Sequence, residues 1–177
     1  NLFLPTLFLI ITSFFRDYNL TAELGILIGV NIIFTQIFSA NARSIIISKK
    51  LTSLIYNYII FRITVSIILI CANLLFFSIF EFSNKFLLLA VSFLIIFQWL
   101  NELILTFFEL KKRVSEFYFY ISFCLIFIVF IIVDFFYHQN LIYVFFINNI
   151  LLLLFFFIFF LEIKKIKKKK IYLEKFF

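Results

Sequence analysis

The chain has 177 residues, of which 66% are hydrophobic and only 14% are charged, and its mean hydropathy is +1.20. A soluble domain of this size has too little interior to bury so much apolar surface, so the composition excludes the soluble globular classes and indicates an integral membrane protein. We ascribe the net charge of +7 to cytoplasmic loops and expect no nucleic-acid partner. Only helices or closed barrels satisfy their backbone in lipid, and long continuous apolar runs favour an all-α membrane bundle.

Several functional classes lack their usual residues. Cys71 and Cys124 both fall inside apolar runs, which is typical of buried apolar-like side chains rather than a disulfide framework or a metal site. The sequence shows no phosphate loop, metal-ligand cluster or nucleophile–base arrangement. We therefore expect no catalytic residue, metal or cofactor, and a protein that is not an enzyme. The chain contains no methionine, so either residues were processed away or it is a fragment of a longer protein, and we expect a fragment.

Six apolar runs follow one another along the chain, separated by short polar turns. All but the first approach or exceed the roughly 20 residues that a helix needs to cross a bilayer. We expect helices at about 2–15, 22–40, 54–80, 86–108, 117–136 and 141–161, and a basic cytoplasmic tail or linker at 162–177.

The loops between these runs alternate in charge. One set carries Arg43, Lys49, Lys50, Lys111, Lys112, Arg113, Lys164, Lys165, Lys167, Lys168, Lys169, Lys170 and Lys175, whereas the other carries only Arg16 and Lys85. Cytoplasmic loops of membrane proteins are enriched in Lys and Arg. We therefore expect six crossings with both termini in the cytoplasm.

The second run contains both glycines of the chain, Gly25 and Gly29. Small side chains on a membrane helix allow a neighbouring helix to approach closely, so we predict that both glycines serve helix packing. The wall of a substrate cavity is the alternative interpretation. At 100° per residue, the glycines share one stripe with Ala22, Gln36, Ala40 and Arg43.

The third and fourth runs form the hairpin around which we expect the bundle to be organised. Arg62 lies 21 residues before Ser83 in the connecting turn, and Glu102 lies 19 residues after it. Two antiparallel helices would therefore bring both charges to nearly the same depth, at about 1.5 Å per residue. Intramembrane charges usually face a bundle interior and often pair, so we interpret Arg62 and Glu102 as a polar centre. Snorkelling of both side chains to the interface is the alternative.

Other polar side chains extend this centre along the two helices. Ser66 and Asn73 share the face of Arg62, and Gln98 and Glu109 share the face of Glu102. Asn101 and Thr106 flank that face, and Asn148 with Asn149 in the sixth run fits the same interior. The candidate substrate-binding or cavity-lining residues are Arg43, Arg62, Ser66, Asn73, Gln98, Asn101 and Glu102.

The second run continues into Phe38-Ser39-Ala40-Asn41-Ala42-Arg43, and a basic segment follows the sixth run. With six helices and cytoplasmic ends, the chain resembles the N-terminal half of a lipid-linked oligosaccharide flippase of the polysaccharide-exporter type. This type belongs to the multidrug/oligosaccharidyl-lipid/polysaccharide exporter (MOP) superfamily. Such proteins resemble two six-helix bundles that face each other, and the second bundle is missing from this chain.

The resemblance implies that the protein moves an undecaprenyl-linked sugar unit from the inner to the outer leaflet of the bacterial cytoplasmic membrane, by alternating access. Its partners would be membrane lipids, the lipid-linked oligosaccharide and the second bundle. From position and chemistry we assign Arg62 and Arg43 to the pyrophosphate, and Glu102 to coupling or pairing. The sugar contacts would be Asn73, Gln98 and Asn101.

Two other functions remain open. A membrane enzyme of envelope-polysaccharide assembly, such as a polymerase, should carry catalytic residues on a large extracytoplasmic loop, and the expected outer loops are short. A membrane subunit that does not itself transport is the second alternative.

Overall fold

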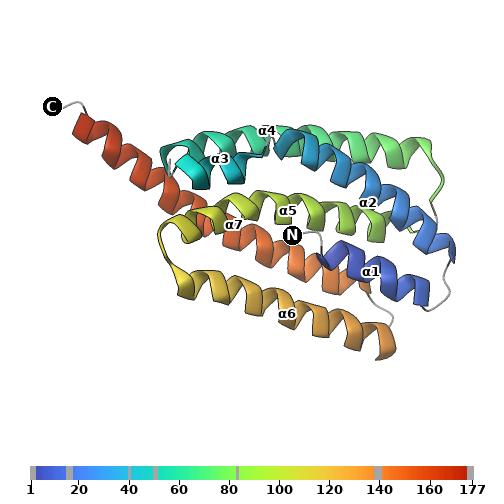
Figure 1. The fold of residues 1–177 in the computed structure, drawn as a ribbon. Helices are drawn as coiled ribbons and strands as arrows, with labels where there is room; N and C mark the ends of the chain where they lie inside the picture. The colour runs from blue at the N-terminus through green and yellow to red at the C-terminus, as the bar shows by residue number, and fades with distance from the viewer. Residues whose placement is uncertain are drawn as a thin grey trace.

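The computed structural model describes residues 3–14, 18–39, 41–49, 52–82, 84–137 and 141–174. Throughout these ranges the chain is helical apart from short turns, which confirms the all-α bundle (Figure 1). Its helices are α1 (Phe3–Phe14), α2 (Tyr18–Ser39), α3 (Ala42–Lys49), α4 (Thr52–Ile79), α5 (Lys85–Leu110), α6 (Val114–Tyr137) and α7 (Leu141–Glu174).

Five stretches of the described chain are long and apolar enough to cross a membrane, so this is a multi-pass membrane protein. A sixth apolar helix, Pro5–Phe14, is shorter. The spanning stretches are Tyr18–Lys49, Leu54–Ile79, Lys85–Leu110, Val114–Val133 and Ile142–Lys165. All six expected helices are present, although residues 2 and 15 of the first and residue 40 of the second lie outside the described ranges.

Helix α5 occupies the centre of the bundle, because it contacts each of the other six helices. Its side chains are buried around most of its circumference, including the polar side chains of Ser92, Gln98, Asn101 and Thr106. The helix begins after Asn84, whose Oδ1 accepts a hydrogen bond from the backbone N–H of Leu87 at 3.2 Å. It ends in a tight turn at Lys112, which has a left-handed φ of 54°.

Two features differ from the expected segments. The stretch after Asn41 is a separate helix, α3, rather than a loop, so Arg43 does not continue the stripe of α2. Helix α7 continues past Leu161 to Glu174 and projects beyond the bundle (Figure 1). Lysine is a good helix former, and the basic segment contains neither Gly nor Pro to end the helix.

The packing glycines of α2 behave differently from the prediction. A Cβ added at Gly29 would meet no heavy atom within 4 Å, so the expected close helix packing there is wrong for the described chain. At Gly25 an added Cβ would lie 3.8 Å from Cδ1 of Leu9 on α1, which is an ordinary van der Waals distance. Helix α1 therefore packs on α2 near Gly25 without needing the absence of a side chain.

Candidate functional site

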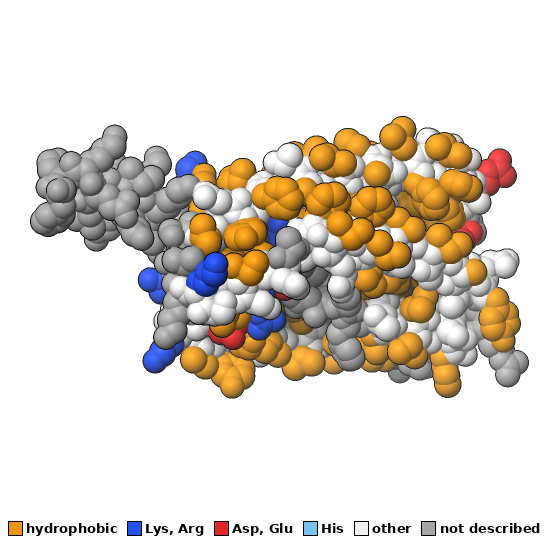
Figure 2. Space-filling model, turned by 45° about the horizontal axis from the view of Figure 1, so that its top comes forward, with side chains coloured by type: hydrophobic (Ala, Val, Ile, Leu, Met, Phe, Trp, Pro, Cys, Tyr) orange, Lys and Arg blue, Asp and Glu red, His pale blue; other side chains and the backbone are white. Residues whose placement is uncertain are grey.

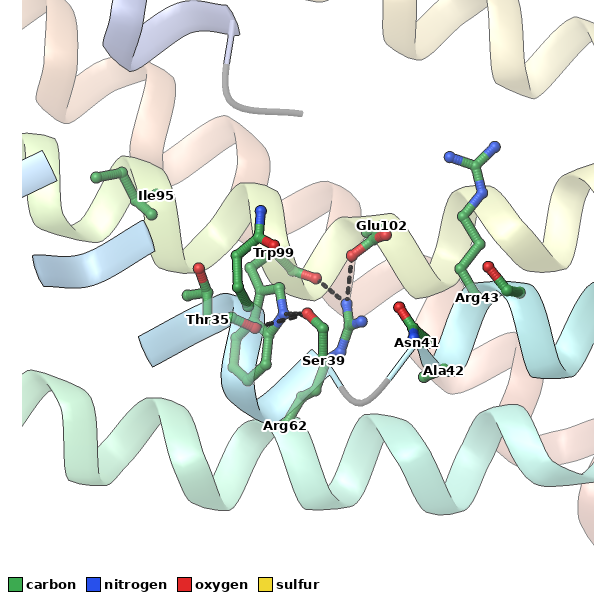
Figure 3. Close-up of a pocket in the computed structure, with 11 residues that line it drawn as sticks. Thr35, Ser39, Asn41, Ala42, Arg43, Arg62, Ile95, Trp99 and Glu102 are labelled. Atoms are coloured by element: carbon green, nitrogen blue, oxygen red, sulfur yellow. Dashed lines mark hydrogen bonds and ion pairs between the residues drawn. The ribbon is translucent and has the colours of Figure 1, made fainter. Parts of the chain in front are cut away.

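A pocket of about 330 Å³ opens where the C-terminal end of α2 and the start of α3 meet α4 and α5 (Figure 3). It lies toward the end of the bundle from which α7 projects, where Lys and Arg side chains gather (Figure 2). Its lining residues are Thr35, Gln36, Ser39, Asn41, Ala42, Arg43, Ser44, Arg62, Ile95, Trp99 and Glu102.

Arg62 reaches from α4 to the wall of this pocket and pairs with Glu102 on α5. The Nη1 atom of Arg62 donates to Oε2 of Glu102 at 2.9 Å and to the backbone oxygen of Trp99 at 2.5 Å. The predicted ion pair is thus present. The side chain of Arg62 is 1% exposed and that of Glu102 is 22% exposed, so the arginine is buried in the bundle and does not snorkel.

The indole of Trp99 packs against the face of the Arg62 guanidinium. The Arg62 guanidinium carbon lies 4.8 Å from the centroid of the Trp99 ring, within cation–π range. On its far edge, Nε1 of Trp99 donates to Oγ of Ser39 at 2.6 Å, and that hydroxyl donates to the backbone oxygen of Thr35 at 2.6 Å. Trp99 therefore connects the arginine on α4 to the last turn of α2.

Two of the three guanidinium nitrogens of Arg62 are not used by the residues that the structure describes. Nε and Nη2 are buried and have no hydrogen-bond partner within the described part of the chain. A buried charged donor without a partner costs free energy, and such groups in native proteins usually meet water or a ligand. The Nε–Nη2 edge is also the side of a guanidinium that can hold an oxyanion in a bidentate manner.

The break between α2 and α3 adds backbone donors to the same pocket. Asn41 has a left-handed φ of 50°, and its backbone oxygen accepts from the N–H of Ile45 at 3.1 Å, which places Asn41 at the N-cap of α3. The N–H groups of Ala42, Arg43 and Ser44 then have no acceptor within the helix. Because a helix N-terminus carries partial positive charge, this wall favours anions.

Arg43 contributes charge at the rim of the pocket. Its Nη2 atom lies 3.1 Å from Oε2 of Glu109, and the two side chains are 48% and 44% exposed. Such an exposed pair is weak, so Arg43 can exchange its partner at little cost.

Of the seven candidate site residues, only Arg43, Arg62 and Glu102 line the pocket. This pocket does not gather all seven, because the remaining four, Ser66, Asn73, Gln98 and Asn101, are buried between helices. Asn73 lines a separate, much smaller pocket between α4 and α5.

The two asparagines of this group take part in helix packing. Asn73 forms a reciprocal amide pair with Asn31 of α2, with N···O distances of 2.9 and 3.2 Å. Asn101 faces α7 and donates to the backbone oxygen of Leu152 at 3.2 Å. A second asparagine, Asn149, donates from α7 to the backbone oxygen of Ala90 at 2.8 Å.

Sequence reasoning missed Trp99, Ser39, Asn41 and Asn31. Trp99 is the only tryptophan of the chain, which was the one available signal for it. Ser39 and Asn41 lie inside the segment that carries the resemblance, next to Arg43, but their contacts depend on the break between α2 and α3. Gln36 and Asn41 are the amide side chains that line the pocket in place of the predicted ones.

Among the described residues, no group of three or more His, Cys, Asp or Glu side chains is placed to hold a metal ion. Comparison with known protein families, with curated proteins and with solved structures gives no match for this chain.

Proposed function

We propose that this chain is one helical bundle of a membrane transporter that moves a lipid-linked oligosaccharide across the bacterial cytoplasmic membrane for envelope-polysaccharide synthesis. A multi-pass bundle with a charged pocket between its helices supports a transport role. On this proposal the substrate carries an anionic pyrophosphate between its isoprenoid chain and its sugar. A second bundle completes the cavity.

The observation that carries the proposal is the unused edge of the Arg62 guanidinium in the pocket wall. Glu102 and the Trp99 carbonyl occupy only Nη1. Nε and Nη2 are closed to solvent in the described chain, so on this proposal the pocket wall opens before a pyrophosphate binds them, and the ion pair stays intact. The N-terminus of α3 supplies further donors, and Arg43 supplies a second positive charge. Glu102 lowers the net charge of the site, which favours release over permanent capture of the anion.

The sugar contacts of the proposal differ from the predicted ones. Gln36 is exposed on the pocket wall, and Asn41 lines the same pocket at the start of α3. Their amides offer both donors and acceptors, as sugar hydroxyls require. Asn73 and Asn101 are already hydrogen-bonded inside the bundle, so we assign them to helix packing.

We place the end of the bundle with the basic side chains in the cytoplasm, because the positive-inside rule assigns Lys-rich and Arg-rich loops to that side. The pocket then loads its substrate from the inner leaflet. Labelling of Ser115→Cys in a cysteine-free background tests the orientation. Efficient labelling by a membrane-impermeant reagent from outside intact cells would reverse it.

The proposal is tested by binding of defined lipids to the purified chain in nanodiscs. We expect a short-chain prenyl-pyrophosphate sugar to bind, and the same sugar on a neutral lipid to bind much more weakly. Arg62→Gln should abolish this preference, whereas Arg113→Gln, which removes a paired arginine outside the pocket, should keep it. Equal retention of both lipids by the wild-type chain would refute the proposed substrate class.

A further inference from the structure

We propose that Trp99 is a positioning residue, which fixes the orientation of Arg62 and couples it to the junction between α2 and α3. The consequence for substrate binding rests on the proposed function, whereas the coupling itself does not. Among the described lining residues, Trp99 alone contacts the guanidinium and also forms a hydrogen bond with the end of α2 (Figure 3).

Trp99 contacts the guanidinium of Arg62 in two ways. Its backbone oxygen accepts from Nη1 of Arg62 at 2.5 Å, and its ring centroid lies 4.8 Å from the guanidinium carbon. One contact fixes an edge of the planar group and the other supports its face. Together with Glu102 on Nη1, they leave the Nε–Nη2 edge as the part without a partner in the described chain.

Trp99 is also connected to α2, through the hydroxyl of Ser39. The Ser39 hydroxyl accepts from Nε1 of Trp99 and donates to the Thr35 oxygen, so both of its hydrogen-bonding roles are taken. Ser39 is the last residue of α2, and Asn41 with its left-handed backbone precedes α3. A shift of α3 that moved the end of α2 would therefore pull on the indole.

These contacts use both the ring and the N–H of tryptophan. Phenylalanine would keep a ring beneath the guanidinium but has no N–H to reach Ser39, and a serine or asparagine would offer no ring. The residues that begin α3 and Arg62 line one pocket, so a link between them lets the two halves of an oxyanion site form together.

The coupling is tested without any ligand by a double-mutant cycle of Ser39→Ala and Arg62→Gln, measured by unfolding of the full chain in detergent. Both side chains contact Trp99, so their effects on the unfolding equilibrium should deviate from additivity by about twofold or more. In a Trp99→Phe background the deviation should vanish. Additive effects in the wild-type background, or a deviation that persists unchanged in the Trp99→Phe background, would overturn the inference.

A spectroscopic readout separates positioning from a general role in stability. Trp99 is the only tryptophan, so all indole fluorescence reports on it. We expect Ser39→Ala and Arg62→Gln each to shift its emission maximum. The matched control Ser78→Ala, which removes an exposed hydroxyl that donates to the Leu75 oxygen at 2.7 Å, should not. Unchanged emission in both pocket variants would likewise contradict the inference.

Inorganic pyrophosphate then connects the coupling to binding. Ser39→Ala should weaken its affinity by about three- to tenfold, because the guanidinium is less firmly held, and Ser78→Ala should leave it unchanged. If the wild-type chain does not bind pyrophosphate at all, the proposed function fails while the ligand-free cycle still decides the coupling. If the wild type binds and Ser39→Ala binds equally well, the positioning role is refuted and the proposed function stands.

Discussion

Two arginines of this protein share the same kinds of partner, a glutamate and an aromatic ring, yet differ in what they leave free. Arg113, in the turn before α6, uses all three of its guanidinium nitrogens. Nε and Nη2 lie 2.7 and 2.6 Å from Oε1 of Glu116, and Nη1 lies 2.6 Å from Oε1 of Glu162. Within the described ranges, Arg62 uses only Nη1, and its other two nitrogens are buried without a hydrogen-bond partner.

The difference separates a structural arginine from a binding one. The hydrogen bond with Glu162 raises the pKa of Arg113, which is 32% exposed, and ties the turn before α6 to α7. Its ring partner, Phe108, lies 5.6 Å from the guanidinium carbon. In contrast, the unpartnered edge of Arg62 is costly for an isolated bundle, and this cost is reduced when water or an anion enters the pocket.

The largest expected effect follows removal of Glu102. Glu102→Ala leaves the buried guanidinium of Arg62 without its counter-charge, which typically costs roughly 3–5 kcal/mol of unfolding free energy. Glu162→Ala removes a partner of the more exposed Arg113 and should cost at most about 1 kcal/mol. Chemical unfolding in detergent compares the two variants. Equal losses of unfolding free energy would contradict the distinction between the two arginines.

A double variant of Arg62 and Glu102 tests whether the two side chains form a buried ion pair. Because Arg62→Leu with Glu102→Leu removes both charges, the double variant should recover part of the stability that Glu102→Ala loses. If the losses of the corresponding single variants simply add, Arg62 and Glu102 do not interact.

An intermediate effect is expected at the amide pair between α2 and α4, which are two walls of the pocket. Asn73→Leu leaves the Oδ1 atom of Asn31 without its donor in a buried site and should cost about 1–2 kcal/mol. The double variant Asn31→Leu with Asn73→Leu should lose less than the sum of the two single variants. Strict additivity would show that the two walls are held together by other contacts.

The smallest effect is expected on the glycine face of α2. Gly29→Ala meets no neighbour and removes the low helix propensity of glycine, so stability should stay the same or rise by up to about 1 kcal/mol. Gly25→Ala, at ordinary contact distance from Leu9, should behave similarly. Thermal unfolding of both variants measures this, and a clear loss at Gly29 would reveal a neighbour beyond the described contacts.

The ion pair was predictable from the sequence because it depends on local geometry. Two long apolar runs joined by a short turn fix an antiparallel hairpin, and nearly equal distances from the turn bring Arg62 opposite Glu102. The burial of Ser66 and Asn73 on the Arg62 face follows from the same helical periodicity. These features require no knowledge of how the other helices pack.

The remainder of the site depends on contacts between helices that periodicity does not specify. Asn101 and Glu102 are adjacent, yet one faces α7 and the other the pocket, because α5 is surrounded on all sides. In the sequence, Trp99 looks like one more apolar residue, because its hydrogen bond with Ser39 depends on how α2 packs against α5. Similarly, the start of α3 depends on the left-handed backbone of Asn41, which no apolar pattern marks.

The most direct test of the binding role of Arg62 is calorimetric titration of the purified full chain with inorganic pyrophosphate. Wild type is compared with Arg62→Gln and with Arg113→Gln, which each remove one positive charge, and with Arg62→Lys, which keeps the charge but loses the bidentate edge. We predict saturable binding that Arg113→Gln retains, Arg62→Lys weakens and Arg62→Gln abolishes. Binding that is lost equally in Arg113→Gln, or retained in Arg62→Gln, would contradict the assignment of the oxyanion site to the free edge of Arg62.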